Sequence, residues 1–206
     1  VAVDLVVADV SFISLRLLVG PLISVTRDDG WVLLLVKPQF EVGRELLGKG
    51  GVVRTPAHQL QAISGVIDAA RECGWRCVGA VPSRLPGASG NREFFVLLRR
   101  TESAADLDLT TLVQDCSRFP AVMLAAGVAA SGAINQTLNM LWQVSEAPAQ
   151  KPAQPSGLGP DSNRRVAVLT HMGRPAAVAA ATRLVEGLSA AGIVSALPAD
   201  DIALLD

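Results

Sequence analysis

The stretch DGWVLLLVKPQFEVGRELLGKGGVVRTP, from Asp29 to Pro56, decides the fold that we expect for the chain around it. It opens with an uncharged run, Trp31–Val36, which is long enough for one strand buried on both faces. Lys37 follows directly, and a loop rich in glycine and charge comes after it. Because α/β proteins bind ligands at the carboxyl ends of parallel strands, Lys37 is a candidate site residue.

Strands and helices alternate on both sides of this stretch. Val3–Val10 is apolar and β-branched, which predicts a central parallel strand with Asp9 near its carboxyl end. Helical spacing over Leu15–Ile23, with Ser14 as a possible cap, predicts the next helix, and Thr55 precedes another. The order strand, helix, strand is the repeating unit of a parallel sheet, so the fold class is α/β.

Two further strands are predicted near residue 100. They are Arg76–Val81 and Glu93–Leu98, joined by a turn-rich segment, Pro82–Asn91, that contains no helical pattern. A short connection of this kind predicts that the two strands pair antiparallel.

The composition changes after Arg100 and divides the chain into four expected parts. We expect residues 1–100 to be one partial α/β domain, 101–144 a helical segment, 145–163 a flexible Pro- and Ser-rich linker, and 164–206 the strand-helix-strand start of a second α/β unit. The apolar part of the helical segment is short and interrupted by amides, which favours a buried helix over a membrane span.

The overall composition excludes some classes of function. The chain has 206 residues, half of them hydrophobic, and a net charge of −1, so it has no global basic signature for nucleic acid, although a local patch remains open. Three cysteines are too few for a disulfide framework and suggest small buried thiols in a reducing cytoplasm; no metal site is expected. No signal peptide is visible at the start, and the chain opens inside a predicted strand, so we expect a fragment.

Three charged residues stand at the ends of predicted strands: Asp9, Lys37 and Glu93. If the strands are neighbours, the three side chains converge above one edge of the sheet. A lysine between carboxylates would need desolvation or a nearby cation before it could act as a base. The spacing alone favours the simpler interpretation of three solvated charges.

Four motifs in order change this interpretation. They are ADVSFISL (residues 8–15), LLVKPQFEVGRE (34–45), GKGGVVR (48–54) and PSRLPGASGNREFF (82–95). Together they resemble the TlyA-type branch of the FtsJ-like methyltransferases over about residues 1–100. Members of that family are ribosomal RNA 2′-O-methyltransferases that use S-adenosyl-L-methionine, and some have been called hemolysins. The resemblance implies the carboxyl-terminal half of a Rossmann-like methyltransferase sheet, ribosomal RNA or a ribosomal subunit as partner, and a cytoplasmic location.

The resemblance also implies roles for residues. The family uses a Lys-Asp-Lys-Glu tetrad, in which Asp9, Lys37 and Glu93 match the last three members. Lys37 would orient or deprotonate the ribose hydroxyl, the carboxylates would position Lys37, and Asp9 would also face the cofactor. The family's first lysine, glycine-rich cofactor loop and S4-like RNA-binding domain would lie upstream of Val1, so we expect this chain to be catalytically incomplete.

Basic residues in the loop after Lys37 form a candidate RNA surface. Arg44, Lys49 and Arg54 would contact RNA phosphates in this interpretation, and are solubilising loop charges in the alternative. The glycines around Lys49 lack the spacing and the following Ser or Thr of a phosphate-binding P-loop.

Residues 164–206 resemble the first strand and helix of bacterial NAD kinases, whose first loop carries a pattern similar to THMGRP here. The GGDGT motif of those kinases does not occur, so kinase activity is not expected. Three alternatives to a methyltransferase stay open: a catalytically inactive RNA-associating fragment, a fusion or read-through product with the start of an NAD kinase, and a membrane-active protein.

Overall fold

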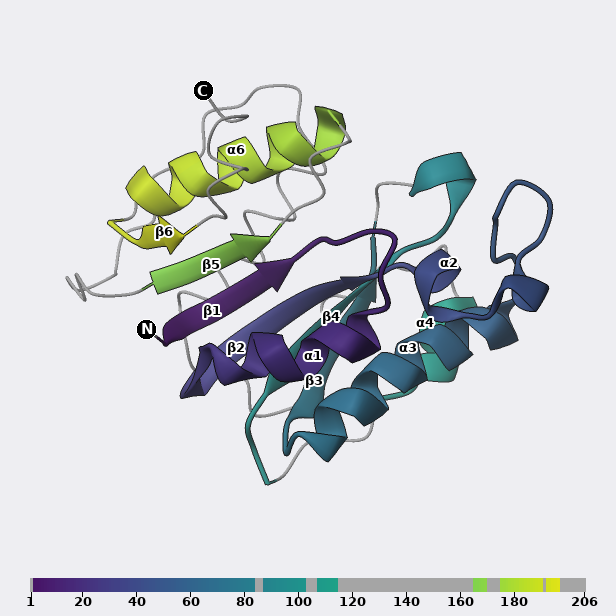
Figure 1. Cartoon of the computed structure of the whole chain (residues 1–206), viewed down its shortest axis with the longest axis horizontal. Coiled ribbons are helices and arrows are strands. Elements are labelled where there is room, and N and C mark those ends of the chain that lie inside the picture. The colour runs from purple at the N-terminus through teal and green to yellow at the C-terminus, as the bar shows by residue number, and fades with distance from the viewer. Residues whose placement is uncertain are drawn as a thin grey trace.

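The structure, a computed structural model, describes residues 2–83, 87–102, 107–114, 165–169, 175–190 and 192–196 (Figure 1). The strands are β1 (Val3–Ala8), β2 (Thr26–Val36), β3 (Arg76–Pro82), β4 (Phe94–Arg99), β5 (Arg165–Leu169) and β6 (Val194–Ala196). The helices are α1 (Leu15–Ser24), α2 (Pro38–Glu41), α3 (Pro56–Glu72), α4 (Leu109–Gln114) and α6 (Pro175–Ala190), with short 3₁₀ helices η1 (Arg44–Leu46) and η2 (Ala88–Gly90).

All six strands belong to one sheet, in the order β3-β4-β2-β1-β5-β6. β1 is parallel to β2 and to β5, and β5 is parallel to β6. β4 is antiparallel to both β2 and β3, which confirms the antiparallel pair predicted from the sequence. The predicted mixed α/β sheet is therefore confirmed, and β1 and β2 end at the edge where β4 begins.

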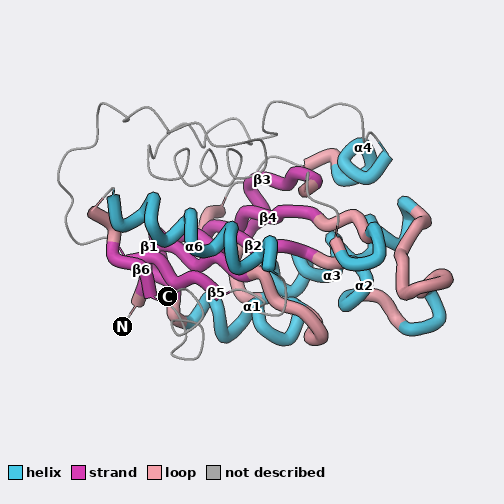
Figure 2. The backbone as a smooth tube through the Cα atoms, turned by 90° about the horizontal axis from the view of Figure 1, so that it is seen from above, coloured by secondary structure: helices cyan, strands magenta, loops and turns pink. Residues whose placement is uncertain are grey.

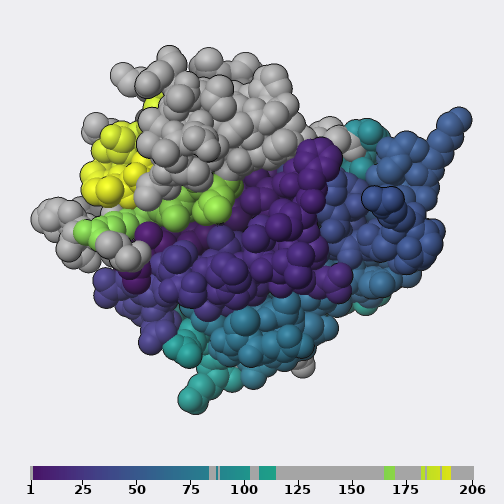
Figure 3. All heavy atoms as spheres, viewed as in Figure 1, coloured from purple at the N-terminus to yellow at the C-terminus, as the bar shows by residue number. Residues whose placement is uncertain are grey.

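Helices cover the two faces of this sheet, with α1 and α3 on one side and α6 on the other (Figure 2). In Figure 3, α1 (purple) and α3 (teal) lie side by side on the face toward the viewer. A hydrophobic core lies on each face of the sheet, and alternate residues of β1 point into the two cores. Val6 and Ala8 pack with α1 and α3, whereas Leu5 and Val7 pack with Leu188 of α6. Full burial of such a side chain stabilises the fold by about 1.5–3 kcal/mol, so both layers hold the sheet in place.

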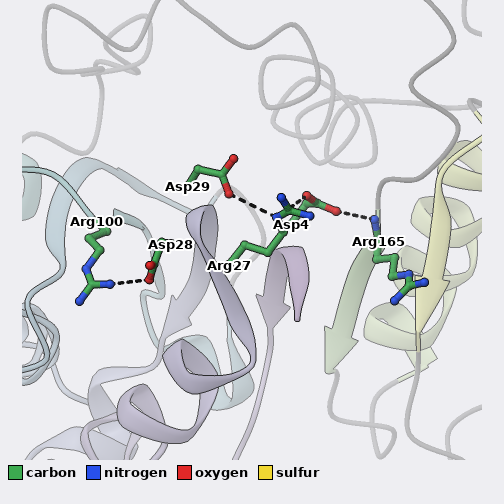
Figure 4. Close-up of polar contacts among 6 residues, drawn as sticks. All are labelled: Asp4, Arg27, Asp28, Asp29, Arg100 and Arg165. Atoms are coloured by element: carbon green, nitrogen blue, oxygen red, sulfur yellow. Dashed lines mark hydrogen bonds and ion pairs between the residues drawn. The ribbon is translucent and has the colours of Figure 1, made fainter. Parts of the chain in front are cut away.

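β2 begins at Thr26, whereas the sequence predicts a strand from Trp31. The charged run Arg27–Asp29 is therefore part of the strand. These side chains are exposed and find partners outside the core: the Arg27 guanidinium lies 3.6 Å from Asp4, and Arg100 pairs with Asp28 (Figure 4). Charged residues can therefore belong to this strand, because the side chains of Arg27–Asp29 face solvent and not the core.

β5 joins the sheet at the edge of β1, over the register Leu5–Ala8 against Val166–Leu169. The backbone N–H of Arg165 also donates to Asp4 Oδ2 at 2.8 Å (Figure 4). The strands described in residues 165–196 lie in the same sheet as those of residues 1–100. The physical reason is that β1 pairs with β2 along one edge only, and its other edge offers unpaired N–H and C=O groups.

Several predictions lie outside the described residues. These are the linker 145–163, most of the helical segment 101–144, and the loop Thr170–Arg174 with His171. The division of the chain into four parts stays a prediction.

The described part of the chain offers neither a membrane-spanning helix nor a metal site. It contains no helix long and apolar enough to cross a membrane, and no group of three His, Cys, Asp or Glu side chains arranged to hold a metal ion.

The two described cysteines differ in burial. Cys77 is buried, as the sequence predicts. Cys73, which lies just past the end of α3, is exposed, so the prediction of a buried thiol is wrong for Cys73.

Candidate active site

Lys37 lies at the carboxyl end of β2, where it also precedes the short helix α2. Its side chain is only 1% exposed. Burial of a charged amine is costly unless polar partners surround it, so its contacts identify the site.

Two oxygen-bearing side chains hold the Lys37 amine, and both come from the turn after β1. Asp9 forms an ion pair with it, and Lys37 Nζ donates a hydrogen bond to Ser11 Oγ at 2.8 Å. Asp9 Oδ1 is the oxygen that faces the Lys37 amine. Because β1 and β2 are parallel neighbours, the sheet brings the Asp9–Lys37 pair together across 28 positions of sequence.

Glu93 lies at the same edge. It precedes β4, whose first residue Phe94 pairs with Val36, so Glu93 follows in register beside Lys37. Its side chain is buried, and Oε1 accepts a hydrogen bond from Gln39 Nε2 at 3.3 Å.

A glycine lies directly behind the Glu93 carboxylate. A Cβ atom added to Gly87 would lie 2.2 Å from Glu93 Oε1, far inside any real contact distance. Only a residue without a side chain leaves room for Glu93 in this orientation.

A second buried carboxylate, Glu41, ties α2 to the start of α1. Its Oε2 accepts a 2.6 Å hydrogen bond from Ser14 Oγ, and its Oε1 accepts a 2.8 Å bond from the Leu15 backbone N–H. The first turn of α1 contains no acidic residue of its own, so Glu41 supplies the negative charge that a helix N-terminus favours. Burial raises the pKa of Glu41, and the contacts with Ser14, Leu15 and Arg16 oppose that shift in part.

The basic loop, which we define as residues 43–54, follows α2 and extends from the body of the molecule (blue in Figure 3). Arg44, Lys49 and Arg54 are all exposed, and none of the three forms an ion pair with another described residue. Their charge is therefore available to a polyanion.

Asn91 fastens the basic loop to the segment that carries Glu93. Its Oδ1 accepts from the Val53 N–H and its Nδ2 donates to the Gly51 carbonyl, both at 3.0 Å. Gln59, on α3, donates to the Val53 carbonyl at 2.9 Å. Asn91 and Gln59 are both buried, so the inner end of the loop is held from two sides.

An aromatic pair borders the site. Phe12 is 81% exposed and has φ 65°, a left-handed conformation that is strained for a bulky residue. Its ring lies 5.1 Å from the ring of Phe40 on α2. The turn Asp9–Phe12 thus presents a carboxylate, a hydroxyl and an exposed ring next to the buried lysine.

The structure therefore brings Asp9, Lys37 and Glu93 to one edge, as the sequence predicts, and leaves the three basic residues on the adjoining loop. The sequence analysis does not assign Ser11, Gln39 or Glu41 to the site. Their positions in the sequence offered a signal, because Gln39 and Glu41 lie in the same motif as Lys37, and Ser11 lies in the same motif as Asp9.

Known proteins are similar in sequence to the first half of the chain. Residues 1–100 match the model of the FtsJ-like methyltransferase family. We call these residues the FtsJ-like segment. The match confirms the resemblance that the four sequence motifs indicate.

Individual relatives match the FtsJ-like segment as well. The "16S/23S rRNA (cytidine-2′-O)-methyltransferase TlyA" of Mycobacterium tuberculosis is 48% identical over 97 residues, which cover 47% of this chain and 36% of that protein. Hemolysin A of Brachyspira hyodysenteriae is 35% identical over 93 residues, covering 44% and 38%. The chain thus spans little more than a third of the length of these curated relatives.

A solved structure is similar to about half of the chain. The crystal structure of a candidate hemolysin from Lactococcus lactis superposes with a TM-score of 0.51 at 35% identity, covering 54% of each chain. The resemblance of residues 164–206 to NAD kinases stays a prediction.

Proposed function

We propose that this chain carries the lysine-bearing half of an active site for 2′-O-methylation of ribosomal RNA, with S-adenosyl-L-methionine as methyl donor. The observation that carries the proposal is the buried Lys37 amine, held against Asp9 and Ser11 and followed in register by Glu93, within the FtsJ-like segment. Relatives with this segment include ribosomal RNA methyltransferases.

The arrangement suits activation of a ribose hydroxyl. A 2′-hydroxyl is a weak nucleophile until its proton is shared with a base. Lys37 supplies a nitrogen at a fixed position, and Asp9 lies against the charge that appears when that nitrogen takes up a proton. Glu93, fixed by Gln39 and Gly87, adds a second negative charge at the same edge.

The carboxyl ends of β1 and β5 place a partly exposed carboxylate, Asp9, where an adenosyl cofactor could bind. The Asp9 N–H donates to the Leu169 carbonyl at 2.6 Å, so Asp9 lies where two parallel strands end, and 24% of its side chain is exposed. Its carboxylate can accept hydrogen bonds from amine or hydroxyl groups, and we assign Asp9 to hold the cofactor. When bound, the cofactor supplies an electrophilic methyl group on a sulfonium.

RNA would approach over the basic loop and the Phe12–Phe40 pair. Arg44, Lys49 and Arg54 are exposed cations that can contact phosphates, and an exposed ring offers a base a surface for stacking. We propose ribosomal RNA or a ribosomal subunit as the partner, and the cytoplasm as the place of action.

The decisive experiment measures transfer of a labelled methyl group from S-adenosyl-L-methionine to purified, unmethylated ribosomal subunits. The enzyme is a fusion protein in which the amino-terminal part of the TlyA relative supplies the other half of the active site. Lys37→Met should lower the rate by on the order of 10²-fold or more, because it removes the acid–base group. Arg71→Gln, on the exposed face of α3, is the matched control and should keep the wild-type rate. Equal rates for Lys37→Met and wild type would exclude the assigned role.

RNA association without methyl transfer is the second candidate, and the three exposed cations of the basic loop favour it. Calorimetric titration with S-adenosyl-L-methionine separates the two, because only a methyltransferase needs to bind it. Neutralising Arg44, Lys49 and Arg54 together should reduce the salt dependence of RNA binding by roughly 0.7–0.9 per lost phosphate contact in log–log slope. An unchanged slope would show that the loop does not contact RNA.

A further inference from the structure

The Lys37 amine lies at the candidate active site but is buried, so a substrate cannot reach it directly. Its side chain is 1% exposed, and its nitrogen contacts Asp9 and Ser11. A substrate hydroxyl cannot approach within hydrogen-bond distance of a nitrogen covered in this way unless a neighbouring group moves. The proton of the substrate therefore needs an intermediate carrier.

Ser11 is the group in a position to be that carrier. It is partly exposed, its Oγ lies 2.8 Å from Lys37 Nζ, and the next residue, Phe12, is 81% exposed. A serine hydroxyl has one donor and two acceptor positions, so it can face the amine and a ligand at the same time. A separation of 2.8 Å suits a proton that moves in either direction.

We propose that Ser11 is a further catalytic residue, which relays the proton of the ribose hydroxyl to Lys37. This inference rests on the proposed function, and assigns within it the group that touches the reacting oxygen. Lys37 and Asp9 then act behind Ser11, as base and as the carboxylate that holds the base.

The step balances as follows in atoms and charge. The ammonium of the Asp9–Lys37 pair first releases one proton to solvent, and the step starts from the resulting amine. The ribose O–H bond breaks and its proton passes to Ser11 Oγ, while the proton of Ser11 passes to Lys37 Nζ, which becomes an ammonium beside Asp9. The ribose oxygen forms its bond to the methyl carbon as the carbon–sulfur bond of the sulfonium donor breaks, and that electron pair stays on sulfur. Release of one proton from Lys37 to solvent restores the start.

Kinetics of Ser11→Ala and Ser11→Thr, measured in the fusion protein with the amino-terminal part of the TlyA relative, test the role. Ser11→Ala should lower kcat by on the order of 10²-fold with little change in KM for the ribosomal subunit, and Ser11→Thr, which keeps a hydroxyl, should recover most of kcat. Ser24→Ala is the matched control, since Ser24 lies at the far end of α1 and bonds only the Pro21 carbonyl among the described residues. Wild-type kcat in Ser11→Ala would overturn the proposal and leave the role of Lys37 intact.

A second readout does not depend on activity. The chain has three lysines, at 37, 49 and 151, so the ¹⁵Nζ signal of Lys37 can be assigned in an NMR spectrum by its loss in Lys37→Met. Exchange of its Nζ protons with water should be slow in wild type and in Ser11→Thr, and at least several-fold faster in Ser11→Ala. Exchange that is unaffected by Ser11→Ala would overturn the contact, whether or not the wild-type chain transfers methyl groups. If this chain shows the exchange pattern but the fusion protein transfers no methyl group, the proposed function and the relay are overturned, while the contact is confirmed.

Discussion

Lys37 and Asp9 form an ion pair whose members differ in exposure: 1% of the lysine side chain is accessible, against 24% for the aspartate. The carboxylate is therefore the more solvated member of the pair. Lys37 depends on Asp9 for its burial, because removal of one partner leaves an uncompensated charge in the protein interior.

Asp9→Asn should destabilise the fold by about 2–3 kcal/mol. This is less than for a fully enclosed pair, because Asp9 is partly solvated. Urea denaturation measures the change in the free energy of unfolding. The double variant Asp9→Asn/Lys37→Met should be less destabilised than Asp9→Asn alone, since the orphaned ammonium is gone. Additive losses in the double variant would contradict a coupled pair.

The pKa of Glu41 is raised by burial, so its carboxylate takes up a proton more readily in the folded state than in the unfolded state. A raised folded-state pKa gives stability that is fully present below the unfolded value of about 4.5 and is lost as pH rises through the folded value. The wild type should therefore gain stability relative to Glu41→Gln as pH is lowered from 7 to 4. Urea denaturation of both proteins across this range checks the sign, and a difference independent of pH would refute the shift.

Gly87→Ala should disturb Glu93 directly, since the new methyl group would lie 2.2 Å from Oε1. We expect a loss of about 1–3 kcal/mol, as for other overpacked sites, together with lower methyl transfer. Gly20→Ala is the control, because its added Cβ would meet only Cys73 Sγ at 3.9 Å and it lies within α1. Thermal denaturation should show the control to be neutral or slightly more stable.

Asn91→Leu should release the basic loop, because the Val53 N–H and the Gly51 carbonyl lose their partners. Each lost hydrogen bond costs about 1 kcal/mol, so local opening should rise by roughly tenfold or more. Trypsin cleavage after Lys49 and Arg54 measures this opening. Asn91→Asp keeps the acceptor for Val53 and should give an intermediate rate; cleavage at the wild-type rate in Asn91→Leu would exclude the clamp.

The two described cysteines should differ in reactivity. Burial raises the pKa of Cys77 to about 11, so at pH 8 its reactive thiolate form is only on the order of a thousandth of the total. Cys73 is exposed. Iodoacetamide at pH 8, followed by peptide mass spectrometry, should label Cys73 well before Cys77, and equal rates would mean that β3 opens readily.

The sequence predicts those parts of the site that follow from strand order. Asp9, Lys37 and Glu93 each stand at the end or start of an apolar run, and parallel and antiparallel neighbours necessarily bring such ends together. The contacts of Ser11, Gln39 and Asn91 depend on how loops fold back, which no periodicity encodes. The role of Glu41 could not be predicted from the sequence for a related reason: it caps a helix that begins 26 positions before it.

Strand boundaries were less predictable than strand existence. A hydrophobic pattern does not predict the start of β2 at Thr26, because the first residues of this strand are charged. Arg27 pairs with Asp4, and Asp28 pairs with Arg100. The union of β5 with β1 was equally hidden, because it depends on an unpaired edge and not on any feature local to residues 165–169.

The pairing of β5 with β1 has a consequence for biosynthesis. Asp4 and Arg165 meet across 161 positions, so β1 leaves the ribosome long before its second neighbour is made. At a synthesis rate of about 5–20 residues per second, that edge waits roughly 10–30 s for β5. During this interval it is an open template for strands of other nascent chains, and slow translation or premature termination should favour aggregation over the completed sheet.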